Sequence, residues 1–100
     1  MLSNDTILKK IEENRKIIRE YGIKRIGLFG SYVRSEQKHG SDIDVLVEFE
    51  EGEKTFDNYM DLKFFLEELF GCNVDLVIAE AVKPRLKSYI LENVRYAEGL

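Results

Sequence analysis

The hydrophobic positions of the chain follow a helical period in three segments. Apolar side chains recur every three or four positions across residues 4–21 and 55–70, which predicts two amphipathic helices. Residues 81–97 repeat the pattern and predict a third helix, in whose first turn Pro84 can be accommodated. Gly71 follows the second of these segments and is a plausible C-terminal stop for it.

Three shorter segments have the character of strands. Residues 24–29 and 73–79 are short apolar runs, and residues 42–49 alternate strictly between two faces. One face of this last segment carries Ile43, Val45, Val47 and Phe49, and the other carries Asp42, Asp44, Leu46 and Glu48. Strands interleaved with helices predict an α/β (α+β) domain, a small sheet with helices packed mainly on one face. The order alone does not fix the strand directions.

Size, charge and cysteine content narrow the class of protein. One hundred residues suit one domain, so we predict a single domain over residues 1–100. The net charge of −4 argues against nucleic acid as a partner, because phosphate binding needs a concentrated basic face. No apolar run has the length of a membrane span, and the single Cys72 rules out an intrachain disulfide. We therefore predict a cytoplasmic protein without a membrane partner; self-association stays open.

The aspartates of two strand segments are the candidates for chemistry. Asp42 and Asp44 open one strand on the same side, and Asp75 is the single polar residue in "VDLVIA". Solvated strand aspartates are the ordinary alternative, but isolated carboxylates in apolar surroundings are costly unless their charge is compensated. Positions two apart on a strand are about 7 Å apart, and a neighbouring strand lies about 5 Å away. If the third strand pairs with the second, the three carboxylates converge.

A divalent cation would relieve the repulsion between such carboxylates. Oxygen ligands with few imidazoles or thiols favour Mg²⁺ or Mn²⁺, with substrate phosphates completing the shell. Gly30 and Ser31 fit the same site, because a glycine lets a phosphate approach the backbone and a helix start presents N–H groups to an anion. Arg34 could reach the same phosphates.

The spacing of these residues resembles a known signature. Gly30-Ser31, ten intervening residues and Asp42-Ile43-Asp44 are similar to the motif of the nucleotidyltransferase superfamily related to DNA polymerase β. The short chain resembles the minimal branch of that superfamily, the MntA-like antitoxins of HEPN/MNT toxin–antitoxin pairs. The segment "GSYVRS" departs from the usual Gly-Ser-x-Ala-Arg-Gly at Val33 and Ser35, which puts the packing of that loop in doubt.

The resemblance implies a mixed sheet in a polymerase β-like fold and a metal–nucleotide site at the strand ends. It implies that Asp42 and Asp44 bind two Mg²⁺ ions with ATP. It assigns Asp75 to the catalytic ion and to deprotonation of the acceptor hydroxyl, and Gly30 and Ser31 to the β- and γ-phosphates. AMP would be transferred to a tyrosine hydroxyl of the partner HEPN ribonuclease, which silences that toxin.

Two alternatives to this function stay open. The same fold could transfer AMP to a small hydroxylated molecule such as an aminoglycoside, with a second subunit completing the site. A second alternative is a binding module that neutralises the toxin by contact alone, without use of the carboxylates.

Overall fold

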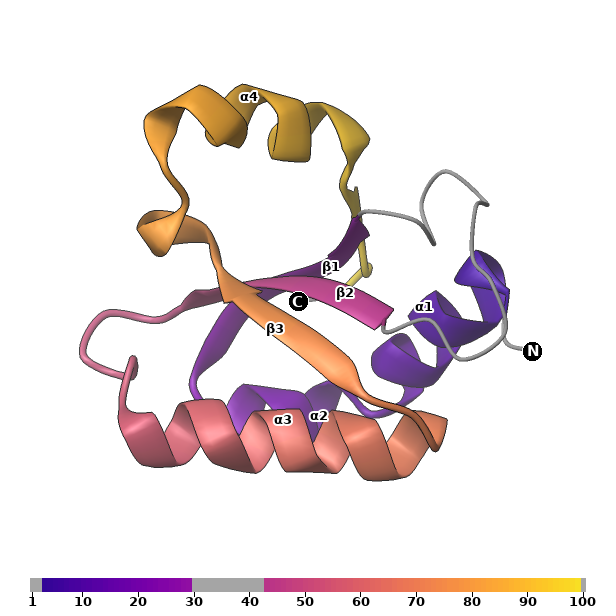
Figure 1. Cartoon of the computed structure of the whole chain (residues 1–100). Helices are drawn as coiled ribbons and strands as arrows, with labels where there is room; N and C mark the ends of the chain where they lie inside the picture. The colour runs from indigo at the N-terminus through magenta and orange to yellow at the C-terminus, as the bar shows by residue number, and fades with distance from the viewer. Residues whose placement is uncertain (1–2, 30–42, 100) are drawn as a thin grey trace.

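The computed structural model describes residues 3–29 and 43–99 of the chain (Figure 1). The sheet within these ranges has the strand order β3-β2-β1-β4, with β2 and β3 parallel and the other two pairs antiparallel. The mixed sheet that the resemblance implied is confirmed. In chain order the elements are α1 (Asn4–Glu13), α2 (Arg15–Glu20), β1 (Ile23–Phe29), β2 (Ile43–Phe49), α3 (Phe56–Phe70), β3 (Val74–Ile78), the 3-10 turn η1 (Ala79–Ala81), α4 (Pro84–Asn93) and β4 (Arg95–Tyr96).

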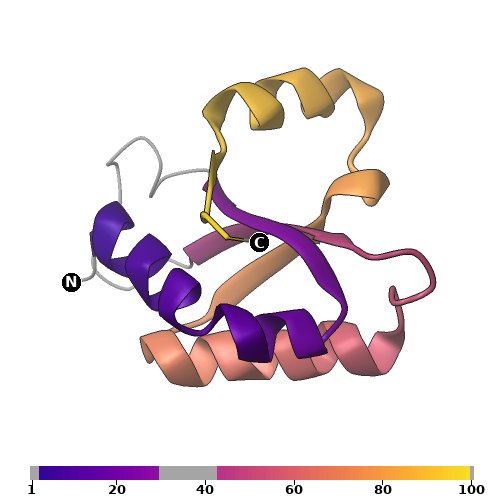
Figure 2. The same ribbon diagram turned by 180° about the vertical axis from the view of Figure 1, so that it is seen from behind.

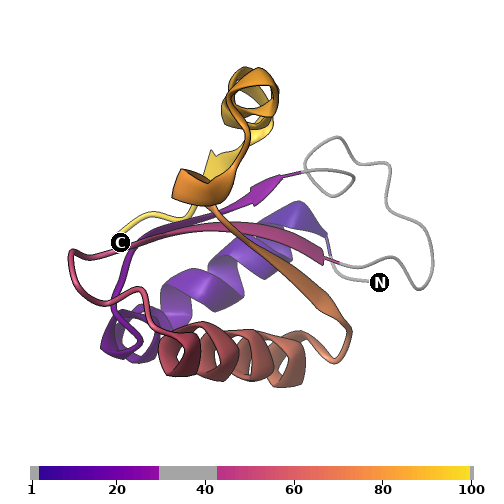
Figure 3. The same cartoon turned by 60° about the vertical axis from the view of Figure 1, so that its left-hand side comes forward.

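The helices divide unequally between the two faces of the sheet. Helices α1, α2 and α3 cover one face, and α4 lies over the other (Figure 3). From behind, α1 and α2 are seen to pack beside β1 (Figure 2). A single cluster of buried apolar side chains fills the space between the three helices and the sheet, as the predicted one-sided packing requires. Its members are Ile7, Leu8, Ile11, Ile18, Ile23, Ile26, Leu28, Ile43, Val45, Val47, Phe49, Leu62, Leu66, Phe70, Val74, Leu76 and Ala97.

The first predicted helix, residues 4–21, is two helices, so its prediction as one element is wrong. The chain turns at Asn14, whose φ of −108° and ψ of 18° are not helical. The Asn14 side-chain amide donates to the carbonyl oxygen of Lys10 at 2.8 Å. A short polar side chain that bonds a nearby carbonyl competes with the helical hydrogen bonds, which explains the break.

Helix α3 matches its prediction closely. The hydroxyl of Thr55 caps its start by accepting from the backbone N–H of Asn58 at 3.1 Å. Gly71 ends the helix with a φ of 69°, a left-handed conformation that favours glycine. No helix in the described ranges has the length and apolarity needed to cross a membrane.

The C-terminal segment differs from its prediction at both ends. The predicted helix of residues 81–97 begins only at Pro84, its first helical residue, and ends at Asn93. After it, β4 pairs with β1, with Tyr96 opposite Gly27. A Cβ atom on Gly27 would lie 2.8 Å from the backbone oxygen of Arg95, so this close pairing requires glycine. The sequence did not indicate β4, since two residues carry no periodicity.

Candidate active site

The parallel pairing of β2 with β3 brings two of the predicted carboxylates together. Asp44 lies directly opposite Asp75 in the register of the two strands. Residues opposite each other on paired parallel strands point to the same face, with Cα atoms about 5 Å apart. Ile43 and Val45, on either side of Asp44, are fully buried in the core. Both carboxylates therefore lie on the opposite face, over which α4 stands, which we call the α4 face.

The end of β1 lies beside the same pair. Phe29, the last residue of β1, is paired with Asp44 on its other side. Because Phe29 directly precedes Gly30 in the sequence, the predicted phosphate-binding segment follows a strand end that adjoins the carboxylates. The other predicted site residues lie outside the described ranges, and their roles stay predictions: Gly30, Ser31, Arg34 and Asp42.

The carboxylates of Asp44 and Asp75 lie at the margin of the part of the sheet that α4 covers. Leu46, two residues beyond Asp44 on the α4 face, is only 1% exposed. It lines a cavity of about 10 Å³ together with Ile90 of α4, so the helix lies over the middle of β2. Asp44 itself is half-buried, and Asp75 is exposed. Solvent and a substrate can therefore reach the start of β3.

The next acidic side chain on this face has a different environment. Glu48 forms an ion pair with Arg25 of β1 at 3.5 Å, and the guanidinium of Arg25 also lies 3.8 Å from the centre of the Tyr96 ring. In contrast, the carboxylate of Asp75 makes no hydrogen bond or ion pair with any part of the chain that the structure describes. The acidic groups of the α4 face are thus not equivalent: Glu48 is held by Arg25, whereas Asp75 is available to a ligand.

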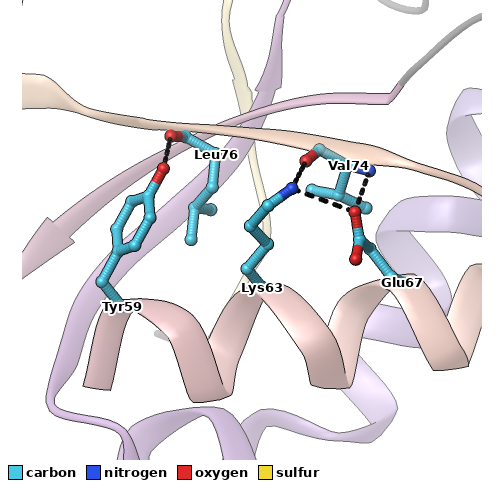
Figure 4. A network of polar contacts seen from close by, with 5 residues as sticks. All are labelled: Tyr59, Lys63, Glu67, Val74 and Leu76. Atoms are coloured by element: carbon cyan, nitrogen blue, oxygen red, sulfur yellow. Dashed lines mark hydrogen bonds and ion pairs between the residues drawn. The ribbon is translucent and has the colours of Figure 1, made fainter. Parts of the chain in front are cut away.

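Three side chains of α3 hold the strand that carries Asp75 (Figure 4). The hydroxyl of Tyr59 donates to the carbonyl oxygen of Leu76 at 2.7 Å. The ammonium of Lys63 donates to the carbonyl oxygen of Val74 at 2.7 Å. The carboxylate of Glu67 accepts from the backbone N–H of Val74 at 3.0 Å and from Lys63 at the same distance.

Glu67 is the described acidic residue whose titration this arrangement changes. The hydrogen bond from the Val74 backbone N–H and, next, that from Lys63 hold the pKa of Glu67 below its ordinary value of 4.5. Desolvation opposes these contacts and is outweighed. Sequence reasoning missed this group of residues. Tyr59, Lys63 and Glu67 are visibly spaced by four in the sequence. Their contacts with β3 could not be predicted from it, because they depend on β3 being an edge strand.

A cavity of about 450 Å³ beside β3 is separate from the carboxylates. It is lined by Phe56 and Tyr59 of α3 and by Leu76 and Ile78 of β3, among others. Leu76 alternates with Asp75 along the strand, so its side chain points to the opposite face of the sheet. The cavity therefore does not extend the candidate site.

The donor set suits a hard divalent cation. Among the described residues no group of three or more His, Cys, Asp or Glu side chains could hold a metal ion. Asp44 and Asp75 supply two carboxylates on one face, and Mg²⁺ commonly binds one or two protein carboxylates together with substrate phosphates. The residues present therefore fit Mg²⁺ or Mn²⁺, and Asp42 would add a third carboxylate.

Comparison with known proteins agrees with this geometry. A family model described as the nucleotidyltransferase domain matches residues 8–97. Over 97 residues the chain is 39% identical to protein adenylyltransferase MntA of Thermococcus cleftensis, covering 96% of this chain and 97% of the relative. A solved structure named provisionally as a minimal nucleotidyltransferase superposes with a TM-score of 0.81 at 34% identity, over 94% of this chain and 95% of the other. A chain from a crystal structure of a toxin–antitoxin with AMP-PNP superposes with a TM-score of 0.73 at 25% identity, over 93% and 73% of the two chains.

Proposed function

Because the chain belongs to the nucleotidyltransferase domain family, we propose that it is a protein adenylyltransferase that transfers AMP from ATP to a partner toxin and so acts as an antitoxin. The observation that carries the proposal is the register of Asp44 with Asp75 on an accessible part of the sheet, beside the strand end that leads into Gly30-Ser31. The similarity to an MntA protein along nearly the whole chain supports a protein as the acceptor. The similarity to a toxin–antitoxin crystallised with AMP-PNP supports ATP as the donor.

The acceptor that we propose is a tyrosine hydroxyl of a HEPN ribonuclease toxin. The Gly-Ser and Asp-x-Asp signature, which resembles that of the MntA-like antitoxins, is the support for this choice. A cytoplasmic location fits both the ATP requirement and the presence of a single cysteine, which cannot form an intrachain disulfide.

The proposed reaction is an attack of the acceptor hydroxyl on the α-phosphorus of ATP. An oxygen–phosphorus bond forms to the acceptor, and the bond from the α-phosphorus to the bridging oxygen breaks, so that pyrophosphate leaves with the electron pair. The hydroxyl proton passes to a base, and the role suits Asp75, because an exposed carboxylate can come within hydrogen-bond reach of the acceptor.

The remaining residues would bind and orient the nucleotide. Gly30 and Ser31 would hold the β- and γ-phosphates, with Arg34 in reach of the same groups. Asp42, Asp44 and Asp75 would hold two Mg²⁺ ions, or Mn²⁺, which supply neutralisation of the phosphate charge during displacement. The half-buried position of Asp44 would restrict its carboxylate to a small range of orientations.

The test is adenylyl transfer with purified components. The protein is incubated with Mg²⁺, ATP labelled at the α-phosphate and a purified HEPN-type toxin, and the label on the toxin is followed with time. Asp44→Asn should lower the transfer rate by more than about hundredfold, because even outer partners of a metal site are worth 10–100-fold. Glu48→Gln is the matched control, an acidic residue on the same face of the same strand.

The two variants separate the proposal from its rivals. Label on the toxin that disappears with Asp44→Asn and persists with Glu48→Gln supports the proposal. Neutralisation of the toxin by Asp44→Asn at the level of the unchanged protein, with no label transferred, would overturn it in favour of inhibition by contact. Transfer of label to an aminoglycoside but not to the toxin would overturn the choice of acceptor.

A further inference from the structure

The backbone next to Asp75 is held more firmly than the rest of the outer edge of β3. Both the N–H and the C=O of Val74, the preceding residue, are bonded by side chains of α3. The Val74 carbonyl belongs to the peptide group that joins Val74 to Asp75, so Lys63 fixes the plane from which the Asp75 Cα atom extends. Tyr59 donates to the carbonyl oxygen of Leu76, the following residue, so side chains of α3 bond the backbone on both sides of Asp75 (Figure 4).

The spacing of residues in a helix and in a strand explains why three side chains of α3 are enough to hold β3. Four residues of a helix advance about 6 Å, and two residues of a strand advance about 6.6 Å. Anchors spaced by four on α3 can therefore meet successive outward-facing peptide groups of β3, as Tyr59 and Lys63 do at Leu76 and Val74. The match keeps β3 in one longitudinal position along α3.

The position of the Asp75 carboxylate depends on this backbone. Its side chain makes no hydrogen bond or ion pair with the rest of the described chain, so no side-chain contact there corrects a shift of β3. On the inner side, β3 is held by its ladder with β2, including the bond from the Ile43 N–H to the Asn73 carbonyl at 3.1 Å. The α3 anchors hold the outer side, and the two together set Asp75 opposite Asp44.

We propose that Lys63 and Glu67 are positioning residues that fix the Asp75 carboxylate at the separation from Asp44 that a shared divalent cation needs. This inference rests on the proposed function, because it takes Asp75 to be a metal ligand. Protection of an edge strand against pairing with other chains is the simpler role for such contacts. In that role, Lys63 and Glu67 would contribute to stability and solubility but not to the affinity for the metal ion.

The experiment measures the affinity of Mn²⁺ for the full chain in the presence of AMP-PNP, by titration calorimetry. Glu67→Ala and Lys63→Met should each weaken Mn²⁺ binding by about tenfold, the lower end of the range for outer partners of a metal site. Glu67→Gln keeps an oxygen that can accept from the Val74 N–H, and it should recover most of the affinity. Glu80→Gln is the control, since it removes the exposed ion pair with Lys54, 3.6 Å long, just beyond the other end of β3.

A comparison in the Asp75→Asn background separates positioning from a general structural role. If Glu67 acts through Asp75, Glu67→Ala should change the residual Mn²⁺ affinity of Asp75→Asn by less than about twofold. An equal loss in both backgrounds would overturn the inference, as would wild-type Mn²⁺ affinity in Glu67→Ala alongside a lowered melting temperature. Tyr59→Phe, which removes one hydrogen bond and no charge, gives a second variant should Glu67→Ala fail to fold; its Mn²⁺ affinity should fall by a smaller factor, and an unchanged affinity would count against positioning.

The same set of variants distinguishes failure of this inference from failure of the proposed function. Wild-type Mn²⁺ affinity in Asp75→Asn would remove Asp75 from the metal site and with it both claims. A strong loss in Asp75→Asn with none in Glu67→Ala or Lys63→Met would leave the proposed function in place and remove the positioning role alone.

Discussion

The two faces of the sheet are built from alternate residues of the same strands, yet they differ in almost every property. The face under α1, α2 and α3 is apolar and closed, with Ile43, Val45 and Val47 of β2 fully buried. The α4 face carries Asp44 and Glu48 of the same strand, and one helix covers it in part. The contrast separates most of the apolar core from the carboxylates of the candidate site. One face buries most of the apolar side chains, and the other holds charged groups that burial alone would not favour.

Truncation of a core residue next to the site should have the largest effect on stability. Ile43→Ala should lower the free energy of unfolding by about 2–5 kcal/mol, because it removes buried methyl groups and leaves a cavity on the closed face. Urea unfolding followed by circular dichroism measures the loss. Ile43→Val is the matched control and should cost about 0.5–1.5 kcal/mol. A loss below about 1 kcal/mol for the alanine variant would contradict the division between the faces.

A smaller loss is expected where β4 approaches β1. Gly27→Ala should lower the free energy of unfolding by about 1–3 kcal/mol, since the added Cβ would lie 2.8 Å from the backbone oxygen of Arg95 and something must shift. The same unfolding experiment applies. Gly52→Ala adds a methyl group with no atom within 4 Å but at a φ of 80°, so its cost reports backbone strain without a clash. A loss of less than about 0.5 kcal/mol in Gly27→Ala would show that β4 does not pair as described.

The hydrogen bond that Glu67 of α3 makes to β3 should make the free energy of unfolding depend on pH in the acidic range. The pKa of Glu67 is lowered in the folded protein, so its contribution is present above its ordinary value of 4.5 and is lost as the pH falls through the lower folded pKa. The difference in unfolding free energy between the unchanged protein and Glu67→Gln should therefore be larger at pH 7 than at pH 3.

Tyr59→Phe provides the control for that series, because it removes a hydrogen bond to the same strand without an acidic group. Its cost in stability should be the same at pH 3 and pH 7. A Glu67→Gln difference that stays constant over this range would argue against the contact with the Val74 N–H.

The smallest effect is expected from the exposed ion pair of the α4 face. Arg25→Met should lower the free energy of unfolding by at most about 1 kcal/mol. An exposed ion pair and an exposed cation–π contact each contribute about 1 kcal/mol or less. The cost, measured by urea unfolding, should shrink in 1 M salt, which screens surface charges. A loss well above 2 kcal/mol would show that this face contributes more to folding than its exposure suggests.

Much of the fold was predictable because the periodicity of the chain reports burial directly. Helix α3 with its glycine stop and the alternating strand β2 followed from the spacing of apolar residues alone. The break at Asn14 did not, because the apolar stripe continues across it and a side-chain hydrogen bond decides the outcome. Strand β4 could not be predicted either, since its two residues form a strand only by pairing with residues far earlier in the chain, Arg95 with Leu28 and Tyr96 with Gly27.

The candidate site likewise has a part that the sequence predicted and a part that it did not. The motif and the strand aspartates were visible in the sequence, and the parallel pairing that sets Asp44 beside Asp75 confirmed the step on which their convergence depended. Lys63 and Glu67 were not found, because their contacts join two elements whose neighbourhood no local pattern encodes. The proposed ligand-binding residues therefore follow from the motif, whereas the proposed positioning residues follow from the tertiary structure.

A crystal structure with Mn²⁺ and AMP-PNP would show whether Asp44 and Asp75 share a divalent cation on the α4 face. Anomalous scattering from Mn²⁺ locates the ion independently of the protein atoms. We expect an anomalous peak within about 2.2 Å of a carboxylate oxygen from each of the two aspartates and close to the phosphates of the nucleotide. Nucleotide and metal bound together elsewhere, with the two carboxylates turned away from any common ion, would contradict it.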